Sequence, residues 1–129
     1  MPRGTVEIQN TTRESIPRIP FEKMGMDILG KGYSLSLVIC ADALSRSINK
    51  EYRKKDYAPN VLSFPLQKNE GEIFLNVRKA EREARTFGKK PKQHIARLYV
   101  HGCFHLKGLT HGANMDAHEQ AVLKKFGLA

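Results

Sequence analysis

The sequence predicts a single layered domain of the α+β or α/β class over residues 1–129. Two patterns predict this class. Short alternating or continuously apolar runs, typical of strands, are interspersed with stretches in which apolar residues recur every three or four positions, typical of helices. A chain of 129 residues is also long enough to bury a core without disulfides.

Two strands and one helix are expected before residue 41. Residues 6–9 are a short strand candidate. A helix is expected at about 19–29, because Pro20 suits a first turn and Gly30 suits a stop. Residues 33–40 begin with clean alternation and become continuously apolar, which predicts a strand that enters the core.

A second helix and a third strand are expected next. Asp42 is a candidate N-cap, and apolar residues then recur every four positions, at Leu44, Ile48 and Tyr52. Pro59 ends any helix, and residues 60–64 have the composition of a strand bounded by Pro65.

The remaining chain predicts one more strand, at residues 71–77, and three helices. The first of these helices ends at Gly88 and has an apolar face made of Ala80, Ala84 and Phe87. The second begins near Pro91 and is expected to bury Ile95, Leu98 and Phe104. The last runs from Asn114 to Gly127 and is expected to bury Met115, Val122 and Phe126.

Three histidines between residues 101 and 111 carry the clearest functional signal. On a helix, His101 and His105 lie one turn apart on the same face, close enough to ligate one ion. Gly108 can adopt the left-handed backbone that ends the helix and turns His111 back toward the other two rings. Three imidazoles without a fourth protein ligand predict an open, catalytic zinc site with one ion per chain. Nickel or another divalent transition metal suits the same donors.

The histidine segment resembles the H-G-x-[LF]-H-L-x-G-[YL]-D-H signature of the YbeY family, and here reads His101-Gly-x-Phe-His105-Leu-x-Gly108-Leu-Thr-His111. The segment from Glu51 to Pro65 resembles the family pattern Y-R-x-K-D-x-x-T-[DN]-V-L-S-F-P, with one extra residue beside its Asp and Pro59 in place of Thr. The strand start G-[DE]-I is matched by Gly71-Glu72-Ile73. These three segments stand in the family's order.

The resemblance implies an α+β fold with a mixed sheet of about four strands, about five helices, and a metal site on a helix and the loop that follows it. It implies a metal-dependent endoribonuclease specific for single-stranded RNA, active in rRNA maturation at the 3′ end of 16S rRNA and in ribosome biogenesis and quality control. The implied partners are rRNA precursors and proteins of the small ribosomal subunit.

One position departs from the family signature: Thr110 stands where Asp normally precedes the third histidine. If that Asp orients an imidazole, this chain binds metal more weakly or uses another partner for the ring. Two alternatives therefore stay open: a ribosome-associated RNA-binding factor with a structural or vestigial metal site, and a metal-dependent phosphoesterase or hydrolase of another substrate. A zinc-protease mechanism is disfavoured, because its general base would follow His101, where the chain has Gly102.

The net charge of +9 favours a polyanionic partner. Basic residues cluster between Arg78 and Arg97 and again at residues 53–55. A single basic cluster is as often a solvated face, but two clusters around a metal site favour RNA. The candidate RNA-binding residues are Asn60, Ser63, Arg82, Arg85 and Lys89.

Arg53 is the candidate catalytic residue. The charge that develops in a phosphodiester transition state needs a cation, and a guanidinium offers it two donors. The resemblance implies the same role, because Arg53 occupies the arginine of the family's Y-R pair. His94 lies two helical turns before His101 and is expected to be buried and hydrogen-bonded or, alternatively, to face the RNA.

Cysteine usage and hydropathy lead us to expect a soluble, cytoplasmic protein without a membrane segment. The chain has two cysteines, Cys40 and Cys103, which are expected to be reduced thiols. On a helix Cys103 points away from His101, so it is expected in the core rather than at the metal. No stretch approaches the roughly 18 apolar residues that cross a bilayer, and the N-terminus lacks an apolar signal core.

Overall fold

The computed structural model describes residues 4–109 and 112–129, which form four strands and five helices. The strands are β1 (Val6–Asn10), β2 (Ser34–Cys40), β3 (Val61–Gln67) and β4 (Glu70–Asn76). The helices are α1 (Phe21–Leu29), α2 (Asp42–Arg53), α3 (Val77–Thr86), α4 (Pro91–Leu106) and α5 (Ala113–Lys125). Each of these elements corresponds to a segment that the residue pattern predicts.

The four strands form one mixed sheet in the order β1-β2-β4-β3. β1 pairs parallel with β2, and β2 pairs parallel with β4. β3 pairs antiparallel with β4 through a tight turn and forms one edge of the sheet. The mixed four-stranded sheet implied by the family resemblance is therefore confirmed.

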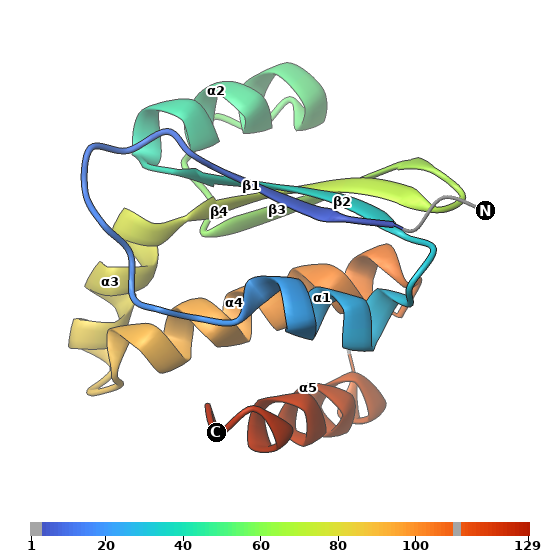
Figure 1. Cartoon of the computed structure of the whole chain (residues 1–129). Helices are drawn as coiled ribbons and strands as arrows, with labels where there is room; N and C mark the ends of the chain where they lie inside the picture. The colour runs from blue at the N-terminus through green and yellow to red at the C-terminus, as the bar shows by residue number, and fades with distance from the viewer. Residues whose placement is uncertain (1–3, 110–111) are drawn as a thin grey trace.

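Helices cover the two faces of the sheet unequally (Figure 1). α2 lies on one face, whereas α1 and α4 lie side by side on the other, and α5 packs on α4 as a further layer. α3 runs from the end of β4 to the start of α4 and packs on α4. Among the described helices, none is both long and apolar enough to cross a membrane.

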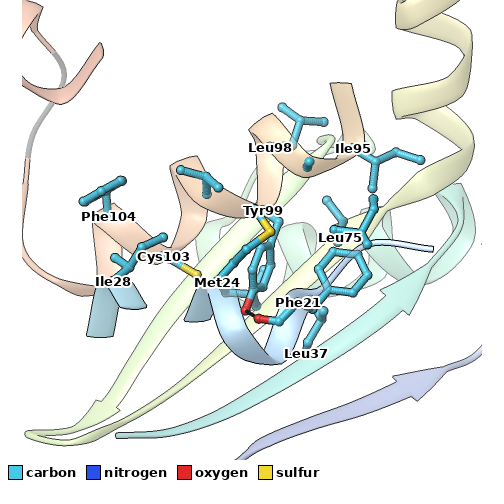
Figure 2. Packing of buried hydrophobic residues seen from close by; sticks show 14 of the residues in the cluster. Phe21, Met24, Ile28, Leu37, Leu75, Ile95, Leu98, Tyr99, Cys103 and Phe104 are labelled. Carbon is cyan, nitrogen blue, oxygen red and sulfur yellow. Dashed lines mark hydrogen bonds between the residues drawn. The ribbon is translucent and has the colours of Figure 1, made fainter. Parts of the chain in front are cut away.

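The core lies between the sheet and α4 (Figure 2). The Tyr99 ring is fully buried, meets Phe21 edge to face at 4.8 Å, and donates its hydroxyl to the Phe21 carbonyl at 2.7 Å. Cys103 is buried beside it, as expected from the helix periodicity. Burial raises the pKa of the Cys103 thiol to about 12, so this sulfur stays protonated at neutral pH and is unsuited to ligate a metal.

The helix ends follow the predicted signals, with one exception. Gly88, Gly108 and Gly127 all have positive φ and follow α3, α4 and α5. The prediction that Asp42 caps α2 is wrong. Ala41 occupies the cap position, and the Asp42 carboxylate instead accepts hydrogen bonds from Asn76 and Arg82.

Three further expectations about packing are wrong. α2 buries Ser45 and Asn49, while Tyr52 is 63% exposed, because the helix packs with its polar side against the loop before β3. β3 does not end before Pro65 but continues through it, since an edge strand tolerates a residue without an N–H. Phe87 is 63% exposed rather than buried on the apolar face of α3.

Candidate active site

One polar stripe of α4 faces a cavity of about 860 Å³. His94, Arg97, His101 and His105 lie on this stripe, at the spacing of successive helical turns. Arg53 at the end of α2 and residues of β3, α3 and α5 complete the cavity wall. The fold therefore brings two of the predicted histidines, His101 and His105, and the predicted Arg53 to one space, although their helices lie on opposite sides of the sheet.

The two described histidines of the predicted metal site are turned toward each other. The Nε2 atoms of His101 and His105 are 2.9 Å apart, and the two rings are nearly perpendicular. His111 and Thr110 lie outside the described residues. Within the described part of the chain, no group of three or more candidate ligands occurs, so His101 and His105 are the described portion of the predicted triad.

Glu119 holds the His101 ring from the side opposite His105. This carboxylate on α5 is only 3% exposed, and its Oε2 lies 2.7 Å from His101 Nδ1. A carboxylate accepts a hydrogen bond from the ring nitrogen that it faces, so His101 carries its hydrogen on Nδ1 and its Nε2 lone pair points toward His105. The residue pattern gave no indication of Glu119, which lies 18 residues after His101, in the middle of α5.

Two guanidinium groups line the cavity without ion pairs to described residues, those of Arg53 and Arg97. Both side chains are exposed. Arg97 stands one turn before His101, a spacing that could have identified it from the sequence once α4 was recognised. Two such cations beside converging imidazoles form a surface suited to phosphate groups.

At the end of the cavity away from His105, Glu83 of α3 is the centre of a hydrogen-bond network. Its carboxylate accepts from Asn60 Nδ2 at 3.1 Å and lies 3.0 Å from His94 Nε2. Burial raises the pKa of Glu83, but these hydrogen bonds and the nearby charges of His94 and Lys79 outweigh it and hold the pKa below its ordinary value. His94 is buried and hydrogen-bonded, as expected, and its Nδ1 is buried without a partner in the described residues.

Ser63 lines the cavity but is already engaged in packing α4 against the sheet. Its hydroxyl donates to the Gly102 carbonyl at 3.1 Å. A Cβ at Gly102 would lie 2.9 Å from Ser63 Oγ and 3.2 Å from Ile73 Cδ1. Gly102 therefore permits the close approach between helix and sheet that sets the position of His101.

The predicted basic RNA-binding residues lie on the exposed surface of α3 and the turn after it. Arg82 donates to Asp42 at 2.9 Å, which lowers the pKa of that carboxyl. Arg85 and Lys89 are exposed, and none of the three residues lines the cavity. Their role in RNA binding stays a prediction that concerns the surface outside the cavity.

Known proteins resemble this chain over most of its length. The sequence profile of the family described as Endoribonuclease YbeY matches residues 5–127. The Endoribonuclease YbeY of Pseudomonas entomophila (strain L48) is 38% identical over 103 residues, covering 74% of this chain and 66% of that protein. That of Acidovorax sp. (strain JS42) is 32% identical over 126 residues, covering 91% and 83%.

The extent of these matches differs between relatives. The Endoribonuclease YbeY of Aromatoleum aromaticum (strain DSM 19018 / LMG 30748 / EbN1) is 39% identical over 98 residues, and the match covers 64% of that protein. The chain thus spans just under two thirds of the length of this relative and of the Pseudomonas protein. A solution structure of a Thermotoga maritima protein has the same fold, with a TM-score of 0.72 and 19% identity over 94% of this chain and 88% of that one. From the profile match and these relatives, the chain belongs to the YbeY family.

Proposed function

We propose that this chain is a metal-dependent endoribonuclease that cleaves single-stranded RNA in rRNA maturation. The observation that carries the proposal is one cavity lined by two converging imidazoles on α4 and by the guanidinium of Arg53. The relatives named Endoribonuclease YbeY support the reaction, and the net charge of +9 supports an RNA substrate. rRNA precursors and small-subunit proteins in the cytoplasm are the proposed partners.

We propose His101, His105 and His111 as the residues that hold one ion, zinc or another divalent transition metal. The donor set of the two described histidines fits such an ion, because both Nε2 atoms point to the same space and Glu119 keeps the His101 proton on Nδ1 rather than Nε2. When bound, the ion supplies a Lewis acid that polarises a phosphoryl oxygen and lowers the pKa of a bound water.

The chain's own residues supply the remaining parts of the mechanism. Arg53 stabilises the negative charge that develops on the phosphodiester in the transition state. Arg97 binds a phosphate of the RNA strand and orients it in the cavity. Glu119 holds a proton on His101 Nδ1 and fixes the orientation of that ring.

The test is cleavage of a single-stranded RNA by the purified protein, with and without a chelator. Cleavage is expected to depend on the metal and to disappear in His105→Ala. His118→Ala is the matched control, because His118 is an exposed histidine on α5 that does not line the cavity. Cleavage that persists in His105→Ala would show that a contaminating nuclease is responsible. RNA binding by the wild type without any cleavage would favour the alternative function, an RNA-binding factor.

The role of Glu119 has a test that is independent of activity. Glu119→Gln keeps the shape of the side chain but removes the charged acceptor of the His101 proton, so metal affinity is expected to fall about 10- to 100-fold. Competition with a coloured chelator measures this affinity directly. In the metal-free protein, ¹⁵N NMR is expected to show the Nδ1–H tautomer of His101 in the wild type and loss of that preference in the variant. Unchanged affinity would remove Glu119 from the metal site.

A further inference from the structure

Phe87 places an exposed aromatic ring at the Glu83 end of the cavity. It is 63% exposed and lines the cavity wall. Its N–H donates to the Glu83 carbonyl at 2.9 Å, so the helical turn continues to this residue and Phe87 lies one turn beyond Glu83 on the same face of α3. Phe87 therefore lies at the cavity wall one helical turn beyond the hydrogen-bond network of Glu83.

Asn60, which lines the same cavity as Phe87, presents a fixed acceptor. The Glu83 carboxylate can only accept hydrogen bonds, so it fixes the Asn60 amide with Nδ2 toward Glu83 at 3.1 Å. Asn60 Oδ1 then has no hydrogen-bond partner among the described residues and lies on a residue that lines the cavity. Glu83 is held in turn by His94, whose ring is only 6% exposed. The acceptor is therefore organised before any ligand arrives.

We propose that Phe87 and Asn60 form a nucleobase subsite, in which a base of the RNA stacks on the Phe87 ring and donates an N–H to Asn60 Oδ1. The inference rests on the proposed function and adds where the strand binds. A flat apolar face, a fixed acceptor and the guanidinium group of Arg97 in one cavity match the three parts of a nucleotide chain: the base face, the base edge and the phosphate.

The subsite binds the base of a nucleotide that lies some distance along the strand from the reacting phosphate. His94, which supports Glu83, stands seven residues before His101 on the same helix, a rise of about 10 Å. A base bound there anchors the strand while the phosphate at the other end of the cavity reacts. Arg97 lies between these two positions on α4 and is placed to contact the intervening backbone.

The absence of tryptophan from the chain permits a direct test. Phe87→Trp introduces a single tryptophan, whose emission is expected to be quenched as a short single-stranded RNA saturates the site, with chelator present to keep the RNA intact. Tyr52→Trp is the matched control: Tyr52 is also 63% exposed and neighbours Arg53 but does not line the cavity. The emission of this control variant is expected to stay unchanged.

Affinity measurements complete the test. Phe87→Ala is expected to bind the RNA about tenfold more weakly at every salt concentration, because stacking is lost while the number of phosphate contacts is kept. Asn60→Ala is expected to weaken binding by a smaller factor. RNA binding that leaves the emission of the Phe87→Trp variant unchanged, or that quenches the Tyr52→Trp variant equally, would overturn the subsite and leave the proposed function intact. No RNA binding by the wild type would overturn both.

Discussion

Helices α2 and α4 pack on opposite faces of the same sheet and deliver side chains to the same cavity, but they are held by different forces (Figure 1). α4 carries the histidines and buries a continuous apolar face that includes Ile95 and Tyr99. α2 carries Arg53 and buries Ser45 and Asn49, which donate hydrogen bonds to the loop before β3.

The two walls of the site are therefore stabilised in different ways. The wall formed by α4, which carries His101 and His105, is fixed by the hydrophobic core. The position of these histidines and the stability of the fold therefore depend on the same contacts. The wall formed by α2, which carries Arg53, is fixed by two hydrogen bonds, from Ser45 and Asn49 to the loop before β3. Its position can change at a smaller cost in folding free energy.

Replacing one isoleucine by alanine on each helix tests this difference, and the loss in the free energy of unfolding is the largest effect that we expect. Ile95 on α4 is fully buried, so Ile95→Ala is expected to lower the free energy of unfolding by about 2–5 kcal/mol. Ile48 on α2 is only half-buried, so Ile48→Ala is expected to cost about half as much or less. Urea denaturation measures both. Equal losses would mean that the core supports the two helices alike.

Substitution of Arg53 tests whether the wall formed by α2 matters for chemistry rather than stability. Arg53→Ala is expected to lower turnover about 10²-fold or more, with metal content, RNA affinity and unfolding midpoint nearly unchanged. Arg53→Lys should remain well below wild type, because lysine lacks the planar pair of donors. Arg46→Ala on the same helix is the control, since Arg46 pairs with Asp56 outside the cavity. A fully active Arg53→Ala protein would make Arg53 a bystander.

Asn49 is the most buried polar residue of α2 and tests how its C-terminal end is fixed. Its Nδ2 donates to the Tyr57 carbonyl at 3.0 Å, and its Oδ1 is buried without a partner in the described residues. Asn49→Ala is expected to lower the free energy of unfolding by about 1–3 kcal/mol, because the Tyr57 carbonyl loses its donor. Ser47→Ala, at an exposed position of the same helix, should be near neutral. Thermal unfolding distinguishes the two.

Lys54 gives the smallest expected effect. Lys54 is the C-cap of α2 and has φ 59°, in the left-handed region. This conformation is unfavourable for any residue that has a Cβ atom. Lys54→Gly is expected to raise the free energy of unfolding by about 0.5–1 kcal/mol, since glycine takes this conformation without strain. Lys55→Gly next to it should not stabilise. A loss of stability in Lys54→Gly would show that the lysine side chain contributes contacts of its own.

The sequence predicts the order and type of every described element. The spacing of apolar residues and the glycines or prolines that end an element are both local features of the sequence. Prediction from these features fails where tertiary contacts compete with them. Phe87 fits the apolar face of α3, but only Ala80 and Ala84 of this face are buried where α3 packs on α4, and the Phe87 ring stays exposed. Asp42 suits a cap, yet the fold brings Arg82 and Asn76 within hydrogen-bond distance of it.

The site was predictable to the extent that its residues lie close together in sequence. His101 and His105 follow from helical spacing, and Arg53 from a family pattern. Glu119 and the pair of Glu83 with Asn60 depend on contacts between α4 and α5 and between α3 and the start of β3, which no local pattern contains. The position and role of His111 as a third ligand remain a prediction.

The two edges of the sheet differ in their tendency to pair with another strand. β3 contains Pro65, which has no N–H to donate, and its register shifts between Pro65 and Gln67. β1 has neither proline nor bulge, and it exposes Ile8 at 48%. We therefore expect β1 to be the edge through which copies of the protein pair when it is partly unfolded or concentrated. Because β3 borders the cavity and β1 lies at the opposite edge, copies joined in this way would keep their cavities open to solvent.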